Sequence, residues 1–414
     1  MGFNFPNTPT IGDLYPTPAL PGVPQYRWDG AVWTTTTYDP LTWVQRAGDT
    51  MTGALNVVTP PTQAAHAASK AYVDAYAAAA APLDALSYSG MQINGSMEVS
   101  QERGSTATGA NSTYICDGWK MFFSGTMVVS AATLSATYFS GLPYLIYLGV
   151  TTAQASLGAN DYTLIGQYIE GWRIARLGWG TAKARPITIG FWTGHNRTGV
   201  YGGVVRNSAS NRTYAFNYTH NVSNVDQYNI ITIPGDTTGT WATDNTIGIN
   251  LVFAVGTGTA FIAPSANTWL AGGYQSAPGQ INGIASTADQ FRISGVVVLP
   301  GIYAPTAAQS PLIMRPYDQE LQTCKRYYEC RRFNTGYSFD MNSWYQQANT
   351  YYFIWDFPVI KRAAPSFALG AGINWVGPPT ISMTTERAFF FGSVAFAAGA
   401  GTAGNISAYA DARL

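Results

Sequence analysis

Short stretches of alternating apolar and polar residues, separated by turns rich in Gly, Asn, Asp and Thr, fill the sequence between residues 91 and 310. The clearest of them are 187–192, 214–218, 229–233, 247–253 and 291–298. Alternation with a period of two is typical of strands with one buried face, and frequent turns join such strands as antiparallel neighbours. The pattern predicts a mainly β protein whose largest part is an antiparallel β-sandwich of jelly-roll type.

Charged residues make up only 11% of the chain, and the formal net charge is zero. Ordinary soluble domains contain about 25% charged residues. A neutral chain offers no basic field to nucleic acid or anionic lipid, so we expect neither nucleic-acid binding nor membrane insertion. Low charge also weakens the repulsion between copies of a chain, which favours an oligomer.

Residues 1–45 contain a dense series of prolines, which prevents a helix and favours extended backbone. Within this segment, the sequence YRWDGAVW at 26–33 predicts a hairpin of two aromatic strands around an Asp-Gly turn. One interpretation is an attachment segment that docks on another protein through its aromatic residues, and the other is a small β-module or flexible arm. The attachment interpretation assigns the docking to Tyr15, Tyr26, Trp28 and Trp33.

Residues 62–81 are almost entirely helix formers, with Thr62 placed to cap the helix and Pro82 to end it. The apolar stripe of this helix is mostly alanine and is too thin to be buried without a close-packed partner. A parallel three-helix neck about a threefold axis would supply that partner, and so would the chain's own β-domain. The neck would bring together Ala65, Ala68, Tyr72, Ala75, Tyr76 and Ala79.

Patterns of catalytic and metal-binding residues are missing from the sequence. The chain has three histidines in no metal-binding spacing, and its acidic residues stand singly among turn residues, where they usually bind their own backbone. The cysteines Cys116, Cys324 and Cys330 have no Cys-x-x-Cys spacing, so we expect free, buried thiols. The sequence therefore predicts a protein that is not an enzyme and needs no cofactor and no metal.

Aromatic residues are the remaining source of binding chemistry, because sugars pack their C–H faces on Trp and Tyr rings and hydrogen-bond to neighbouring amide and charged groups. Loop-like stretches of the C-terminal part, from residue 331 onward, hold the candidates, which are either sugar contacts or core and interface residues. They are Trp344, Tyr345, Trp375, Asn342 and Asn374. On the strand that includes 353–357, Phe353, Trp355 and Phe357 alternate and are expected in the core.

Five tryptophans of the sandwich are expected in its interior. They are Trp119, Trp172, Trp179, Trp192 and Trp241. Two arginines, Arg176 and Arg185, flank Lys183 near one of these tryptophans. They either line a polar groove or protect a solvated edge strand with their charge.

Several segments resemble bacteriophage tail fibres. AGDTMTGAL at 47–55, followed by PTQAAHAASKAYVDA at 61–75, is closely similar to their GDTMTG-type repeat. Short pieces at 93–97, 116–119, 169–172, 177–180 and 234–241 are similar to a carbohydrate-binding-like module of such fibres. RPYDQELQTCKRYYE at 315–329, a predicted helix with Asp318 as its cap, resembles the segment that closes this module. ISAYADARL at 406–414 resembles the end of such fibres, although Arg413 replaces their usual acidic residue.

The resemblance implies a trimeric fibre of a virion, assembled in the host cytoplasm. It implies a virion-attachment segment (1–45), a turn and helical neck (46–90), a jelly-roll carbohydrate-binding-like domain ending in a helix (91–330) and a small C-terminal β tip domain (331–414). The N-terminus of this homotrimer would contact other proteins of the tail, baseplate or collar. Its β-domains would bind host surface polysaccharide through non-catalytic, multivalent contacts. A purely structural head or collar fibre and a polysaccharide depolymerase spike are the alternatives.

Overall fold

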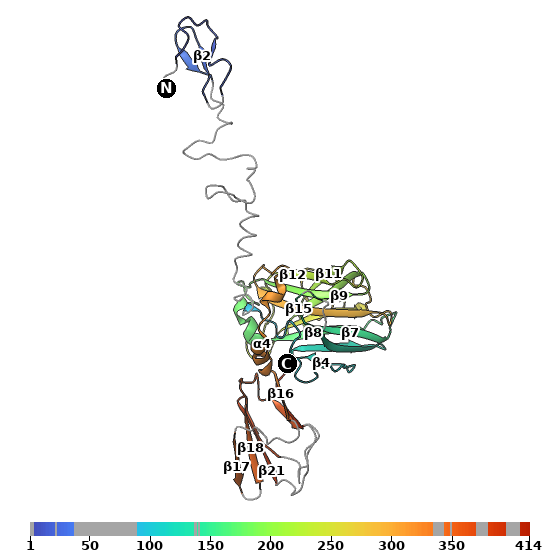
Figure 1. Cartoon of the computed structure of the whole chain (residues 1–414). Helices are drawn as coiled ribbons and strands as arrows, with labels where there is room; N and C mark the ends of the chain where they lie inside the picture. The colour runs from blue at the N-terminus through green and yellow to red at the C-terminus, as the bar shows by residue number, and fades with distance from the viewer. Residues whose placement is uncertain are drawn as a thin grey trace. The chain divides into compact units, whose positions relative to one another are not determined.

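The computed structural model of the chain describes residues 4–20, 23–36, 89–135, 139, 141–333, 343–347, 350–369, 380–394 and 406–414 (Figure 1). These residues belong to two units, Met1–Ala77 and Ala78–Leu414, and each is described by itself. The predicted helix at 62–81 lies outside the described residues. So do the six predicted neck residues Ala65, Ala68, Tyr72, Ala75, Tyr76 and Ala79.

The first unit contains a small antiparallel sheet in the order β1-β2-β3. Its strands are β1 (Leu14–Tyr15), β2 (Tyr26–Trp28) and β3 (Trp33–Thr35). The predicted hairpin is confirmed, since Trp28 pairs with Trp33 across the turn. Asp29 fixes that turn, because its Oδ1 accepts hydrogen bonds from the backbone N–H groups of Ala31 and Val32, each at 2.8 Å.

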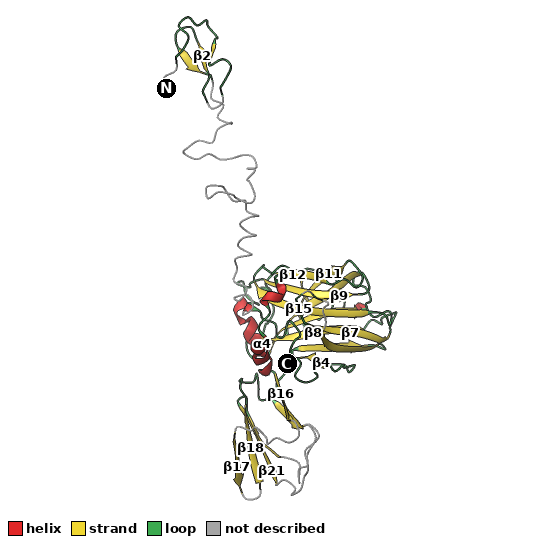
Figure 2. Cartoon of the chain, viewed as in Figure 1, coloured by secondary structure: helices red, strands yellow, loops and turns green. Residues whose placement is uncertain are grey.

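Two antiparallel sheets dominate the second unit and form a β-sandwich, as predicted (Figure 2). The first is seven-stranded, in the order β14-β11-β10-β13-β8-β5-β4. Its strands are β4 (Thr113–Cys116), β5 (Trp119–Ser124), β8 (Tyr162–Glu170), β10 (Gly199–Arg206), β11 (Arg212–His220), β13 (Ile247–Thr257) and β14 (Trp269–Ala271). The second is five-stranded, in the order β12-β9-β15-β7-β6. Its strands are β6 (Val128–Ser135), β7 (Tyr144–Thr152), β9 (Ile187–His195), β12 (Gln227–Ile233) and β15 (Gln290–Pro300).

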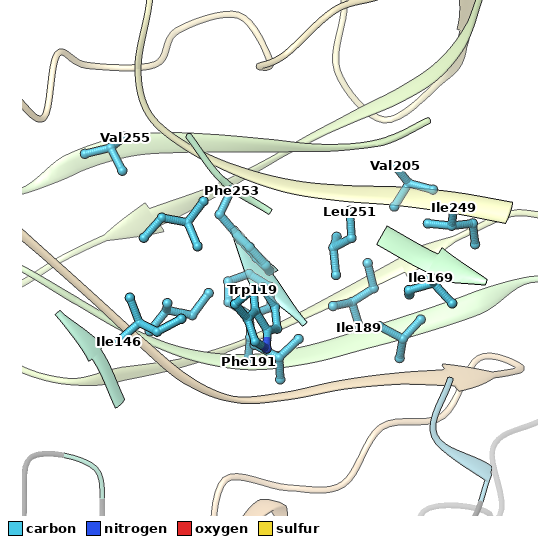
Figure 3. Close-up of a cluster of buried hydrophobic side chains, with 14 of the residues drawn as sticks. Trp119, Ile146, Ile169, Ile189, Phe191, Val205, Ile249, Leu251, Phe253 and Val255 are labelled. Atoms are coloured by element: carbon cyan, nitrogen blue, oxygen red, sulfur yellow. The ribbon is translucent and has the colours of Figure 1, made fainter. Parts of the chain in front are cut away.

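The core lies between the two sheets and is built from every second residue of their strands. Ile249, Leu251 and Phe253 of β13 are fully buried there, opposite residues of the five-stranded sheet such as Phe191. Figure 3 shows Trp119 beside Phe191 and Phe253, whose ring centroids are 4.9 Å apart. Burying each side chain of this size stabilises the fold by about 1.5–3 kcal/mol. The alternation that predicted the strands is thus the pattern that fills the core.

The sandwich tryptophans confirm the interior prediction in part. Trp119, Trp179 and Trp241 are buried, and the half-buried Trp192 donates a hydrogen bond from Nε1 to the hydroxyl of Ser310 at 2.8 Å. For Trp172 the prediction is wrong, because its side chain is 62% exposed. The strand β8 ends at Glu170, and the chain turns into the short helix α3 (Gly171–Ile174) and then η1 (Ala175–Leu177), which takes residue 172 out of the sheet.

The segment that resembles the closing part of the fibre module forms the predicted helix, α4 (Tyr317–Lys325). The cap prediction is wrong, because Pro316 is the N-cap and Asp318 lies within the first turn without capping it. Two further short turns of 3-10 helix occur at η2 (Thr259–Phe261) and η3 (Ser310–Ile313). None of the helices in the described residues is long and apolar enough to span a membrane.

Side chains around α4 attach the first residues of the sandwich to its last ones. Arg315 donates to the backbone carbonyl oxygens of Gly90 and Gln92, and forms an ion pair with Glu320 at 2.9 Å. Glu320 in turn accepts a hydrogen bond from the backbone N–H of Asn94 at 2.8 Å. Since both charged groups are buried, this pair is a structural element of the fold.

The chain ends in two small antiparallel sheets, of three strands in the order β16-β22-β19 and of four strands in the order β17-β18-β21-β20. The strands are β16 (Tyr328–Phe333), β17 (Ser343–Gln347), β18 (Thr350–Asp356), β19 (Ser366–Leu369), β20 (Thr380–Thr384), β21 (Ala388–Val394) and β22 (Ile406–Asp411). Trp355 and Phe357 are buried, as predicted for core residues.

The prediction of free, buried thiols is confirmed for two of the cysteines. Cys116 and Cys324 are buried, whereas Cys330 is half-buried. Burial raises the pKa of the Cys116 and Cys324 thiols, which keeps them protonated and unreactive at neutral pH.

Candidate functional site

The predicted sugar-binding residues of the C-terminal part fall largely outside the described residues. Trp344 and Tyr345 lie in β17, at register positions opposite Phe353 and Tyr352 of β18. Trp375, Asn342 and Asn374 lie in stretches that the structure does not describe. A sugar site at these five positions therefore stays a prediction.

The four predicted attachment residues belong to one aromatic cluster. The ring of Phe5 lies 5.3 Å from that of Tyr15, 5.1 Å from that of Tyr26 and 5.1 Å from that of Trp33, measured between centroids. Trp28 contacts Trp33 at 5.6 Å. All five rings are half-buried, so they form the apolar centre of a small β-module. Their docking on a virion protein stays a prediction.

The outward surface of the seven-stranded sheet gathers side chains that the sequence did not single out. Successive residues of a strand point to opposite faces, and Trp119 and Met121 of β5 point into the core. Lys120 and Phe122 therefore point outward. The same alternation places Tyr168 of β8 outward, next to the buried Ile169.

The order of the strands brings these outward residues into rows. Lys120 of β5 lies opposite Gly166 of β8, and Gly166 lies opposite Val252 of β13. In the next row, Asn250 of β13 lies opposite both Tyr168 of β8 and Arg206 of β10. We call the set of outward residues the aromatic-cationic face, and it consists of Tyr114, Lys120, Phe122, Tyr168, Arg206 and Asn250.

A loop covers the remaining outward surface of this sheet. Leu164, Val204, Ala215 and Ala254 form a second buried cluster with alanines of the segment 259–277. The aromatic-cationic face is less covered, because Tyr114, Lys120, Phe122, Tyr168 and Arg206 are half-buried. Its edge at Tyr114 is covered by the C-terminus, since the guanidinium of Arg413 lies 4.1 Å from the centroid of that ring. The sheet thus has an apolar half that is covered by its own chain and a mixed aromatic and charged half that solvent reaches.

Rings surround the ammonium group of Lys120. Its Nζ lies 5.2 Å from the ring centroid of Tyr114 and 5.3 Å from that of Phe122. Phe122 contacts Tyr168 edge-to-face at 6.0 Å between centroids. A cation this close to an aromatic face gains about 0.5–1 kcal/mol at an exposed site. These contacts fix the direction in which Lys120 presents its hydrogen-bond donors.

The second cation of the face, Arg206, is held by an amide. In the amide orientation that satisfies both groups, the Asn250 side-chain oxygen accepts hydrogen bonds from Nη2 and Nε of Arg206 at 2.9 and 3.0 Å. Within the described ranges, no carboxylate forms an ion pair with Lys120 or Arg206. Their charges therefore remain available to a ligand.

Partial burial shifts the titration of this face. Burial, followed by the nearby guanidinium of Arg413, lowers the pKa of Lys120. Burial also lowers the pKa of Arg206 and raises that of Tyr168. Burial partly strips both cations of water, which strengthens their hydrogen bonds to a ligand.

Gly166 is buried in the middle of the face, where there is no room for a side chain. A Cβ atom at this position would lie 3.0 Å from the carbonyl oxygen of Leu251 and 3.3 Å from a methyl group of Val252. The aromatic rings of the face, together with its ammonium and guanidinium donors, are groups that a pyranose needs. In the part of the chain that the structure describes, no cluster of His, Cys, Asp or Glu could hold a metal ion.

Sequence reasoning missed this face, although each strand carried a signal. Lys120 and Phe122 alternate with the apolar Trp119 and Met121, which marks them as outward residues of a strand. The order of the strands across the sheet was not readable, because β5, β8, β13 and β10 are neighbours that do not follow one another in sequence. The set could not be assembled without that order.

Comparison with known proteins gives distant matches only. No protein-family model and no curated protein matches the chain. One similar structure is the enzymatically active domain of tailspike protein 4 of bacteriophage CBA120, at 13% identity and a TM-score of 0.29, covering 52% of this chain and 22% of that one.

Carbohydrate-binding modules give similar values. A family 11 module of a cellulosomal cellulase of Clostridium thermocellum matches at 11% identity and a TM-score of 0.25, covering 48% of this chain and 96% of the module. A putative sugar-binding protein of Bacteroides thetaiotaomicron matches at 8% identity and a TM-score of 0.28, covering 51% and 99%. Similarity at this level is distant, and it identifies neither a ligand nor a partner of this chain.

Proposed function

We propose that this chain is a non-catalytic glycan-binding protein of a phage virion, which adheres to host surface polysaccharide through the aromatic-cationic face. One observation carries the proposal. Two half-buried cations, Lys120 and Arg206, lie beside the rings of Phe122 and Tyr168 and form no ion pair with a carboxylate among the described residues. Charged residues make up only 11% of the chain, so two cations without an ion pair are better explained by ligand binding than by a role in the fold.

The aromatic rings and the cations of the face would make different contacts with a sugar. Phe122 and Tyr168 offer apolar surface to the C–H groups of a pyranose ring, while Lys120 and Arg206 donate hydrogen bonds to its hydroxyl or ring oxygens. The face holds Asn250 but no acidic residue, so it binds sugar without the carboxylate pair that glycoside hydrolysis requires.

In this proposal, high affinity comes from several copies of the same weak binding site. A single open face of this kind binds weakly, but linked sites raise the overall avidity by about two to four orders of magnitude when their spacing allows simultaneous contact. The trimer inferred from the resemblance to tail fibres would present three such faces. A long polysaccharide with repeating units is the matching ligand.

The proposal is tested with the full-length chain on an array of purified bacterial surface polysaccharides, with released reducing sugar recorded in parallel. We expect saturable binding without release of sugar. Phe122→Ala and Tyr168→Ala should weaken that binding at least tenfold, whereas Tyr303→Ala, at a tyrosine 49% exposed outside the face, should leave it unchanged.

Other results of this experiment would replace the proposal. Release of reducing sugar by the wild-type chain would make it a depolymerase. Absence of binding to every polysaccharide and to intact host cells would favour a purely structural fibre. Equal weakening by the face variants and by Tyr303→Ala would place the glycan site elsewhere on the chain.

A further inference from the structure

A concave site lies where the chain leaves β8. It is a cavity of about 430 Å³, formed by residues 89–91, α3, η1, the loop before β9 and the end of β15. Ligand pockets in proteins typically have volumes of about 300–1,000 Å³. We call it the arginine pocket, and the residues that matter for its chemistry are Trp172, Arg173, Arg176, Leu177, Arg185 and Pro300.

Three guanidinium groups line this pocket, and no acidic side chain does so among the described residues. The side chains of Arg176 and Arg185 are exposed and make no hydrogen bond or ion pair within the described part of the chain. The backbone carbonyl of Arg185 accepts a hydrogen bond from Nε1 of the buried Trp179 at 2.7 Å, which fixes the backbone at this position.

The third guanidinium is oriented by a hydrogen-bond chain. Nε of Arg173 donates to the hydroxyl of Tyr327 at 3.3 Å, and that hydroxyl donates to Glu170 at 2.7 Å. The charge of Glu170 is already balanced, because Arg326 binds both of its carboxylate oxygens at 2.9 and 2.6 Å. Arg173 is therefore held in place without being neutralised, and the pocket carries a surplus of positive charge.

One side of the pocket is apolar. Trp172 is 62% exposed although it is one of the largest side chains of the sandwich, and Leu177 and Pro300 lie beside it in the lining. An exposed indole gives a flat surface of the size of a pyranose ring, and aromatic rings bind the C–H face of sugars. The pocket thus combines a platform for a ring with donors for an anion.

We infer that the arginine pocket binds the carboxylate of a uronic acid residue in a polysaccharide. The planar fork of a guanidinium matches a carboxylate in a bidentate geometry, and Trp172 would support the pyranose ring that bears it. This inference rests on the proposed glycan-binding function and adds a substrate class to it, namely acidic polysaccharides. It also assigns roles to two arginines, Arg176 and Arg185, whose side chains contribute no polar contact to the fold within the described residues.

The test uses the full-length chain and calorimetric titration at low salt with trisaccharides of galacturonate, glucuronate and mannuronate, each beside its neutral counterpart. We expect at least one acidic trisaccharide to bind at least tenfold more tightly than its neutral counterpart. The double variant Arg176→Gln/Arg185→Gln and the single variant Trp172→Ala should each weaken that binding at least tenfold.

Lys183→Gln is the matched control, because it removes one positive charge from the same loop at an exposed residue outside the pocket lining. It should change binding less than twofold. Thermal unfolding of every variant should match that of the wild-type chain, since none of the changed side chains is buried. Inorganic phosphate is titrated as a competitor, to separate a uronate site from a general anion site.

Three results would overturn the inference. Equal binding of acidic and neutral trisaccharides would remove the role of the carboxylate, and full displacement by millimolar phosphate would make the pocket a general anion site. Weakening by Lys183→Gln equal to that of the double variant would indicate long-range attraction instead of a site. If neutral polysaccharides still bind in a manner sensitive to Phe122→Ala, the proposed function stands while the arginine pocket is rejected.

Discussion

The cations inside the sandwich and the cations on its aromatic-cationic face are held in opposite ways. Arg315 is buried, and it forms an ion pair with the buried Glu320 at 2.9 Å while it also donates to backbone carbonyls. Lys120 is half-buried, and it contacts two aromatic rings without forming an ion pair with any described carboxylate. The contacts of Arg315 are all made within the chain, whereas Lys120 keeps hydrogen-bond donors that a ligand can use.

The same division separates other charged residues. Arg212 binds Asp236 with two hydrogen bonds, and Arg292 pairs with Asp226 at 2.9 Å. In contrast, Arg176 and Arg185 extend into a cavity that no described acidic side chain lines. Because charged residues are few in this chain, the presence or absence of a partner distinguishes cations that hold the fold from cations that are available to a ligand.

The largest effect is expected at a cation of the first kind. Arg315→Ala leaves the buried carboxylate of Glu320 without its ion pair and removes the hydrogen bonds to residues 90 and 92. Loss of one partner of a buried pair costs about 3–5 kcal/mol in the free energy of unfolding. Urea denaturation should show this loss, with Lys183→Ala as the control that changes it by less than about 0.5 kcal/mol. A loss below about 1 kcal/mol would mean that the pair contributes little to the fold.

For a cation without an ion pair, such as Lys120, we expect a small effect on stability and a larger effect on binding. Lys120→Met removes a partly desolvated charge and its ring contacts, so the free energy of unfolding should change by less than about 1 kcal/mol. Binding to the polysaccharide should weaken about tenfold, which corresponds to about 1.4 kcal/mol. The two measurements together sharpen the comparison. Strong destabilisation with unchanged binding would assign Lys120 to the fold.

Two buried histidines, His195 and His220, offer a smaller, pH-dependent test of how the interior treats a charge that has no partner. Burial lowers the pKa of His195 and His220, and their mutual repulsion and the nearby Arg292 lower that of His195 further. The unfolded chain takes up a proton near pH 6.5, while the folded chain resists it. The stabilising contribution of these neutral rings is therefore fully present above about pH 6.5 and is lost as the pH falls towards their lowered pKa values.

The expected loss is on the order of 1 kcal/mol for each tenfold difference in proton affinity between the unfolded and the folded chain. The loss is measured as the difference in unfolding free energy between wild type and His195→Gln. This comparison is needed because burial raises the pKa of Asp117 to about 6 and also raises that of Glu98. Both carboxyl groups change the stability in the opposite direction over the same pH range, and they do so equally in the two proteins. The gap in unfolding free energy between the two proteins should narrow from about pH 7 to about pH 5. A constant gap would show that the buried imidazoles do not resist protonation.

The sequence predicted the sandwich because its strands carry the signal locally. The alternation at 247–253 places Ile249, Leu251 and Phe253 in the core, which the structure confirms. The error at Trp172 has a local cause. The sequence does not show that the strand β8 ends at Glu170, two residues before this tryptophan. The closing helix was predicted by its periodicity, but its cap was misassigned because Pro316 and Asp318 are both suitable first residues.

The aromatic-cationic face could not be predicted in the same way. Lys120, Tyr168, Arg206 and Asn250 come from four strands that are far apart in the sequence, and only the register of β5, β8, β13 and β10 brings them together. Register depends on contacts across the whole sheet. The aromatic residues chosen from the sequence were selected for the loop-like composition around them, and that placement is wrong for Trp344 and Tyr345, which lie in the strand β17.

The contact between residues 90–94 and 315–320 has a consequence for synthesis on the ribosome. The backbone N–H of Asn94 binds a carboxylate that lies 226 positions later in the chain. At about 5–20 residues per second, that interval lasts roughly 10–45 seconds. The sandwich therefore completes its fold late in translation, whereas the hairpin at residues 26–35 is complete long before. Pulse proteolysis of stalled nascent chains should show protection of the sandwich only when residue 320 has left the exit tunnel.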